Sequence, residues 1–369
     1  MTIAGALSPC LSRLLIAFTI EFDNEFEHHM PHKTALYGEA GPAPRVSSSG
    51  QVMRRPWLVS RAMWSNAMVF IPPDGAPLAS LEGLGANLPG LERWGYLRRE
   101  PSGQSWVRPT RAGRFAQAVW KRLEGAIERR WQQRFGADLV AELRGALDGV
   151  IGNPGRNLPL YLPMLGYADG MRTSFVSPTD EQLSAAGDQA EHGLAVLLSR
   201  ALVLLAQDYE RESPLSLPMS ADILPAIGTD KVRLRDLPLR AGVSKEAVSA
   251  AAGFLGRTGF AVRDPGPAVA LTDRGIAALN AHDGLLSAAE ECWAGAAQIE
   301  RLRACVLRFA KQQTTDGGSV LSLGLRPYPD GWRAQRRYKS QADAVLADPW
   351  TALPAYPMVL HRGGYPDGS

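Results

Sequence analysis

A cluster of arginines surrounds the turn at residues 101–103. Its members place guanidinium groups on both sides of the turn: Arg93, Arg98, Arg99, Arg108, Arg111 and Arg114. Guanidinium groups bind phosphate oxygens through charge-assisted hydrogen bonds, so this arrangement is typical of a loop that contacts a nucleic-acid backbone. The alternative interpretation is a solvated charged face with a few ion pairs.

A second candidate set lies on a helix predicted from Ser244 to about Gly256. It combines polar side chains near the start of the helix with a basic residue at its end: Ser244, Lys245, Glu246, Ser249 and Arg257. Such side chains hydrogen-bond to base edges when a helix enters the major groove of DNA. The middle of the helix, residues 250–252, is only alanine. The alternative is a helix pair that is kept as a scaffold and reads no bases.

Three histidines near residue 30 are the closest approach to a metal site. His28 and His32 have the i, i+4 spacing that places two ligands on one helical face, but Pro31 interrupts that helix. We therefore interpret these histidines as capping and hydrogen-bonding groups at a helix end. The sequence predicts no metal site.

Sequence signatures of enzymes are missing from the chain. It contains no G-x-S-x-G, P-loop, dinucleotide fingerprint or H-E-x-x-H pattern. We expect no catalytic residues, no cofactor and no enzymatic activity.

Composition and cysteine usage limit the class of protein. The 369 residues are 45% hydrophobic and 21% charged, with a net charge of +3, which indicates a folded chain and is compatible with nucleic acid without demonstrating it. Cys10, Cys292 and Cys305 lack C-x-x-C spacing. Because the apolar runs 14–20 and 194–206 are short, we expect neither a signal peptide nor a membrane span. The sequence thus predicts a cytoplasmic protein that does not associate with membranes.

The elements that must position these residues are clearest between residues 233 and 272. Residues 233–241 have helical spacing, Gly242 suits a left-handed turn, and Ser244 suits the start of the next helix. Two β-prone stretches, 260–263 and 268–271, flank a Pro/Gly turn and predict a hairpin. A helix-turn-helix followed by a hairpin is a winged helix-turn-helix.

Longer helices are predicted to follow each hairpin. Thr110 and Thr272 suit their first positions, and each threonine is followed three residues later by glycine. The first of these helices carries an apolar stripe of residues at helical spacing: Phe115, Val119, Leu123, Ile127, Trp131 and Phe135. A shorter amphipathic helix follows in each half, at about 139–150 and 299–309.

Three sequence echoes indicate an internal duplication. Residues 11–18 recur as 198–205, 94–101 as 258–265, and 158–170 as 353–368, always in the same order. We therefore predict a first winged-helix unit at 1–170, a linker at 171–197, a second unit at 198–325 and a Pro/Gly-rich strap at 326–369.

The order helix-turn-helix, hairpin, Thr-x-x-Gly and two closing helices resembles the MarR group of winged-helix regulators. The resemblance implies a mainly α fold with small β-hairpin wings, in which the two fused copies form an intrachain pseudodimer. It implies that both hairpins point in the same direction, that the second helix of each motif enters a major groove, and that the wings touch the backbone. The expected partner is double-stranded DNA, and the expected oligomeric state is a monomer or a homodimer.

The resemblance also implies a small aromatic or amphipathic effector. Large adaptable side chains that would suit it gather in the first copy: Phe22, Phe26, Trp57, Trp64 and Met68. Aromatic residues at helical spacing also pack ordinary cores. The sequence thus predicts a DNA-binding transcriptional regulator, with a winged-helix scaffold that binds a small molecule or a protein as the alternative.

Overall fold

The computed structural model describes most of the chain, in segments separated by gaps. These are residues 7–33, 55–82, 84, 86–100, 105–152, 158, 178–186, 193–220, 222–243, 245–263, 266–293, 295–331, 334, 343 and 345–353. The fold is mainly helical with small antiparallel sheets, which confirms the predicted class. Within these segments, no helix combines the length and apolarity that crossing a membrane would require.

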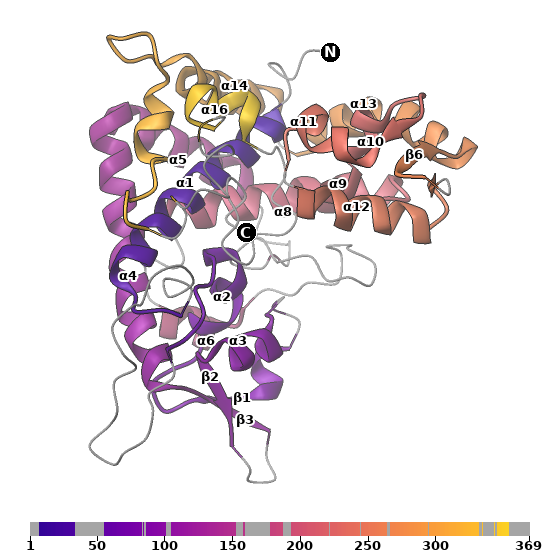
Figure 1. Cartoon of the computed structure of the whole chain (residues 1–369). Coiled ribbons are helices and arrows are strands. Elements are labelled where there is room, and N and C mark those ends of the chain that lie inside the picture. Colours follow the sequence, from indigo (N-terminus) through magenta and orange to yellow (C-terminus); the bar gives the residue numbers. More distant parts are fainter. Residues whose placement is uncertain are drawn as a thin grey trace.

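Six helices form a central core (Figure 1). Three come from each half of the chain: α1 (Leu7–His29), α4 (Arg111–Phe135), α5 (Ala137–Ile151), α8 (Leu194–Glu212), α13 (Asp273–Glu291) and α14 (Ala296–Lys311). Helix α1 packs against α4, α8 and α14, while α5 packs against α8 and α14. Almost every residue of α1 up to Glu27 is buried, as expected for a helix enclosed by others.

The first lobe, which we call lobe 1, comprises the described residues of 55–110. Its elements are α2 (Arg61–Met68), β1 (Ala76–Pro77), η3 (Leu78–Leu81), α3 (Leu88–Trp94), β2 (Leu97–Arg99) and β3 (Trp106–Pro109). Strand β3 lies in the middle of the sheet, which has the order β1-β3-β2. Helix α6 (Asp180–Ala186), from the segment that joins the halves, contacts lobe 1 through a hydrogen bond from Gln182 to the Ser80 carbonyl.

The second lobe, lobe 2, comprises the described residues of 213–272. Its elements are α9 (Leu217–Ser220), α10 (Ile223–Ile227), β4 (Val232–Arg233), η4 (Leu234–Asp236), α11 (Leu237–Ala241), α12 (Lys245–Arg257), β5 (Ala261–Arg263) and β6 (Ala268–Leu271). Its sheet has the corresponding order β4-β6-β5. Gly242 adopts φ +66° between α11 and α12, in the left-handed region as predicted.

One sequence prediction for lobe 2 is wrong in detail. The helix expected from residue 233 begins at Leu237, because Val232 and Arg233 pair with β6 as a third strand. Strand β1 in lobe 1 is a similar two-residue strand. A strand this short shows no alternation of apolar and polar residues, so sequence periodicity did not reveal it.

The same hydrogen-bonded junction joins each sheet to its long helix. The Thr110 hydroxyl accepts from the Gly113 N–H and donates to the Gly95 carbonyl, and Thr272 does the same with Gly275 and Gly259. A Cβ on Gly113 would lie 2.2 Å from the Tyr96 carbonyl oxygen, and one on Gly275 2.0 Å from that of Phe260. The glycine of each Thr-x-x-Gly sequence is therefore required by the close approach of the preceding chain.

The hydrophobic interior is divided unequally between the lobes. Lobe 1 shares one continuous core with the helices, to which Leu91, Tyr96 and Val107 belong. Lobe 2 has a core of its own, formed around Ile223 and Phe260. Lobe 2 is therefore a separately packed body, whereas lobe 1 is built into the helical core.

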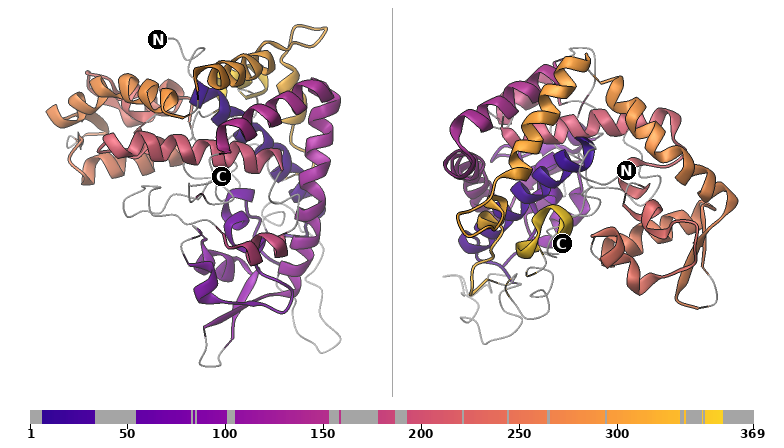
Figure 2. Two further views of the ribbon diagram at one scale, coloured as in Figure 1. Left: turned by 180° about the vertical axis from the view of Figure 1, so that it is seen from behind. Right: turned by 90° about the horizontal axis from the view of Figure 1, so that it is seen from above.

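The two lobes lie on different sides of the helical core. In Figure 1, α4 leads down to lobe 1, whereas α13 leads sideways to lobe 2. The views from behind and from above in Figure 2 agree, with lobe 1 beneath the core and lobe 2 beside it. The expectation that both hairpins point in the same direction is therefore wrong for this structure, because α4 and α13 leave the core in different directions.

Part of the predicted C-terminal strap, residues 326–369, packs on the helical core. Val345 and, after the short helix α16 (Pro349–Ala352), Leu353 are buried in the main core. Directly before the strap, the short helix η5 (Val320–Gly324) brings Leu321 and Leu325 into the same core. The echo between 158–170 and 353–368 falls mostly outside the described residues.

Candidate nucleic-acid interface

The lobe 1 hairpin places most of the predicted arginines at the surface. Arg98 and Arg99 on β2 and Arg108 on β3 flank the turn, whose residues 101–104 lie outside the described part. Arg99 pairs with Glu92 at 3.2 Å and Arg108 with Glu100 at 2.9 Å. The first pair is exposed and the second partly exposed, and ion pairs of this kind contribute little to stability.

Arg98 and Arg108 lie directly opposite each other across the β2–β3 ladder. Like charges at such positions destabilise a hairpin, and Glu100 offsets this only on the Arg108 side. Arg98 itself is exposed and has no ion pair among the described residues. A phosphate between the strands would neutralise this pair of charges.

The start of α4 adds two more cations beside the hairpin. Arg111 and Arg114 are exposed in its first turn, which carries no acidic residue, and Arg114 donates to the Pro109 carbonyl at 2.9 Å. Helix N-termini favour negative charge, so cations at this position reduce helix stability and attract anions. The equivalent turn of α13 has Asp273 instead.

Helix α3 presents few side chains that could hydrogen-bond to a base edge. It has seven residues, begins with Asn87 accepting from the Gly90 N–H at 3.0 Å, and has Pro89 in its first turn. Its exposed Glu92 is paired with Arg99, and the Arg93 guanidinium lies 5.7 Å from the Trp94 ring centre. Helix α3 is thus much shorter than α12, the helix at the corresponding place in lobe 2.

Helix α12 brings three of the predicted residues to one exposed side. Lys245, Ser249 and Arg257 are exposed at four-residue or eight-residue intervals, while Val248 and Leu255 are buried in the lobe 2 core. Ser244 lies outside the described residues, and the Glu246 side chain is also not described.

Lobe 2 carries further exposed arginines that sequence reasoning missed. Arg233 and Arg235 precede α11, Arg240 is in its last turn, and Arg263 lies on β5. Arg240 lies directly before the turn into α12, and its neighbour Leu239 is 92% exposed. Three of these arginines lie within eight residues, which could have signalled a basic surface, but the sequence predicts residues 233–241 as a packing helix and Arg263 as part of the hairpin.

The predicted effector residues are mostly core. Phe22, Phe26, Trp64 and Met68 are buried, and Trp57 is only half-buried under the Lys33 ammonium, 5.4 Å from its ring centre. A further tryptophan completes this cluster, since the Trp64 and Trp120 rings stack with centres 3.9 Å apart. Dense aromatic packing explains most of this side-chain content.

Polar atoms inside this cluster are incompletely satisfied. Arg61 on α2 donates to Glu124 Oε1 at 2.8 and 2.9 Å, a buried ion pair beside the aromatic rings. Within the described part, Glu124 Oε2 and the indole N–H groups of Trp64 and Trp120 are buried without hydrogen-bond partners. Unpaired groups of this kind are uncommon in native interiors and are normally met by water or a ligand.

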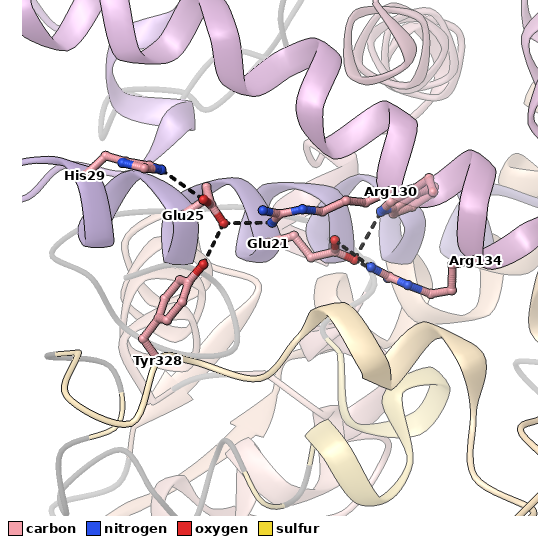
Figure 3. Close-up of polar contacts among 7 residues, drawn as sticks. Glu21, Glu25, His29, Arg130, Arg134 and Tyr328 are labelled. Atoms are coloured by element: carbon pink, nitrogen blue, oxygen red, sulfur yellow. Dashed lines mark hydrogen bonds and ion pairs between the residues drawn. The ribbon is translucent and has the colours of Figure 1, made fainter.

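Two glutamates on α1 each accept hydrogen bonds from several side chains (Figure 3). Glu21 accepts from Arg134 and from the Trp131 indole at 3.1 Å. Glu25 accepts from Arg130 at 2.7 Å, from the Tyr328 hydroxyl at 2.9 Å, and is 3.0 Å from His29 Nε2. Their oxygens are occupied by protein donors, so the network holds α4 and the strap on α1 and leaves no free base.

The pKa of Glu25 agrees with a structural role for this carboxylate. Burial raises the pKa of Glu25, but hydrogen bonds from Arg130, Tyr328 and His29 outweigh it and hold this pKa below its ordinary value. Next to it, the His28 and Tyr328 rings stack with centres 4.3 Å apart. These histidines thus make ring and hydrogen-bond contacts at the helix end, and the described residues include no cluster suited to a metal.

Comparisons with known families, proteins and structures gave no match. The chain matches no protein-family model, no curated protein and no solved structure. Any assignment of function therefore depends on the geometry described above.

Proposed function

We propose that this chain is a DNA-binding transcriptional regulator of MarR type, built as a single-chain pseudodimer of two winged helix-turn-helix units. The equal sheet orders β1-β3-β2 and β4-β6-β5 support a duplication. The matching junctions at Thr110 and Thr272 support it further, because each uses the same two hydrogen bonds. The helical core, with three helices from each half, takes the place of a dimer seam.

The two lobes have different tasks in this proposal. Lobe 2 reads bases through Lys245, Ser249 and Arg257 on α12, because this helix is long enough to lie in a major groove. Lobe 1 grips the backbone through its hairpin and the start of α4, because α3 is short and its exposed glutamate is paired. Since the lobes face different sides, the conformation described here engages a straight duplex through one lobe at a time.

The observation that carries the proposal is the concentration of arginines around the lobe 1 hairpin and the first turn of α4. Its test is binding of fluorescent genomic DNA fragments over a range of salt concentrations. We expect affinity to fall steeply with salt, as counterion release requires. Negligible affinity for every fragment, even at low salt, would refute the regulator.

Substitutions separate the two tasks. Changing Arg98, Arg108 and Arg111 together to alanine is expected to weaken binding to all fragments similarly and to reduce the salt dependence. Changing Lys245 or Ser249 should alter preference among fragments. Arg129→Ala is the matched control, because Arg129 is exposed toward the C-terminal end of α4, away from lobe 1.

A second candidate function is a winged-helix scaffold that binds a small aromatic or amphipathic molecule. It is favoured by the unpaired polar atoms of Glu124, Trp64 and Trp120 in the aromatic cluster. A ligand with a donor for the carboxylate and an acceptor for an indole would satisfy them. Quenching of tryptophan fluorescence by such a compound, lost in Glu124→Gln, would support this function.

A further inference from the structure

A buried tyrosine and histidine meet where lobe 2 joins the helical core. The Tyr209 hydroxyl on α8 lies 2.8 Å from Nδ1 of His282 on α13, and both side chains are buried. On α13, Ala278 and Leu279 pack on the lobe 2 core, whereas Leu286 belongs to the main core. The pair therefore lies at the boundary between the two hydrophobic cores.

The corresponding place in the first half of the chain is filled by apolar rings. When the repeated sequences are aligned, Tyr209 matches Phe22 and His282 matches Trp120. These two residues belong to the cluster of stacked rings that fixes lobe 1. The rings that hold lobe 1 therefore stay uncharged at any pH, whereas the His282 ring at the base of lobe 2 can gain a proton and a positive charge.

The connections on both sides of this pair suit a pivot. The chain between α8 and α9 is a short non-helical link at residues 213–216. Helix α13 contains Gly284, whose α-carbon has open space around it, one half-turn beyond His282. Glycine weakens a helix interior, and the aligned residue in α4 is Arg122. Helix α4 has its interior glycine, Gly125, five residues beyond Trp120, whereas Gly284 lies two residues beyond His282.

We propose that the Tyr209–His282 hydrogen bond is a latch that holds lobe 2 against the helical core, and that protonation of His282 opens it and lets lobe 2 swing about residues 213–216 and Gly284. With neutral His282, Nδ1 accepts the Tyr209 hydroxyl proton. A protonated ring loses that acceptor and carries a charge that its buried place cannot solvate. Swinging lobe 2 away exposes the ring to water and changes the angle between the lobes.

The charged groups around His282 favour its protonated form less than burial disfavours it. Asp283, the next residue, favours the charged ring, but burial is the larger effect and keeps the pKa of His282 below its ordinary value. On α8, Asp208 pairs with Arg211, and Glu210 accepts from the Leu217 N–H. On α13 and α14, Glu290 pairs with Arg303. The elements of lobe 2 that contact α13, namely α10 and β6, consist of uncharged residues.

The direction of the pH dependence follows from these contacts. Because the latched state holds the pKa of His282 below that of a solvated histidine, the latch is stable above the ordinary value and loses stability as pH falls. This inference goes beyond DNA binding, and the measurement that tests it needs no DNA. If the latch fails its test, the proposed DNA-binding function is unaffected. If DNA binding fails its test, the latch is unaffected.

The test is a distance between spin labels on lobe 2 and on the helical core. Cysteines replace exposed Leu239 and exposed Arg129 in a full-length chain in which exposed Cys292 is serine; Cys10 and Cys305 are buried. One distance is expected at about pH 8, and a second, reversible population at about pH 5. An unchanged distribution between these two values would overturn the proposal.

Variants tie this change to the latch. His282→Phe removes both the titrating ring and the hydrogen bond, so its distance distribution is expected to be the same at both pH values, whereas His29→Gln, at an exposed histidine, should respond to pH like the parent chain. A persistent response in His282→Phe would overturn the latch. If that variant does not fold, the protonation of His282 in the parent chain is followed instead, by NMR of its ring resonances. The proposal requires these resonances to titrate over the same pH range in which the distance changes. Titration of the ring without a change in distance refutes the proposal.

Discussion

The effect of substituting a buried polar side chain in this protein depends on which neighbouring groups pair with it. Arg61 and Glu124 form a buried ion pair, and Glu21 and Glu25 are surrounded by donors. The aromatic residues beside them could be predicted from sequence, because large apolar side chains at helical spacing pack inside. The pairing of Arg61 with Glu124, far apart in the sequence, could not, because only the tertiary fold brings α2 onto α4.

Glu124→Ala is expected to destabilise the protein strongly. The substitution leaves the Arg61 guanidinium buried without its carboxylate, a loss of about 3–5 kcal/mol for a pair of this kind. Equilibrium denaturation with urea measures it. Glu128→Ala is the control, because Glu128 pairs with partly exposed Arg144 and should cost at most about 1 kcal/mol. Equal losses in the two variants would contradict this account.

Glu25 is expected to make stability depend on pH in the acid range. Its folded-state pKa lies below the ordinary value of 4.5, so its contribution is present above that value and is lost as pH falls through the folded pKa. Denaturation midpoints measured between neutral and acid pH should therefore fall less in Glu25→Gln than in the parent chain. A parallel decline in both chains would show that Glu25 is not responsible.

Elements joined by tight junctions were predicted well, and those defined only by long-range pairing were missed. Gly242 and the Thr-x-x-Gly starts of α4 and α13 were found because their conformations demand particular residues. Strands β1 and β4 were missed because each is fixed by its partner strand. Phe115, expected within the apolar stripe of α4, is 48% exposed, because the core side of that helix ends at Ala116 near its start.

Gly113→Ala and Gly275→Ala are expected to destabilise their lobes by a similar amount. Each new Cβ would meet a backbone carbonyl oxygen at 2.2 or 2.0 Å, so the strand or the helix must shift. Thermal unfolding measures the loss. Gly145→Ala on α5 is the control, because its Cβ would meet nothing within 4 Å and alanine favours a helix by about 1 kcal/mol. If Gly113→Ala were as stable as this control, the close approach would not be required.

At the scale of the whole molecule, the two lobes share a sheet order but differ in direction, charge and helix length. The repeats predicted two similar units, and the two sheets and junctions are indeed alike. They did not predict the different directions of the lobes, because direction depends on how α4 and α13 cross the core, which local patterns do not encode. The charge of the lobe 1 hairpin and the longer α12 of lobe 2 add to this inequality.

Because lobe 2 has its own hydrophobic core, we expect it to unfold locally without the helical core, whereas lobe 1 should unfold together with the helices. Ile223→Ala removes a buried side chain from that core and should cost about 2–5 kcal/mol locally. Amide hydrogen exchange is then expected to accelerate in α10, α12 and β6 and to stay unchanged in α1 and α5. Trp64→Ala, by contrast, opens the core that lobe 1 shares with the helices, so exchange should accelerate in lobe 1, α1 and α4 together. If Ile223→Ala instead accelerated exchange throughout the helical core, lobe 2 would not be an independent body, and a pivot at its base would lose its physical basis.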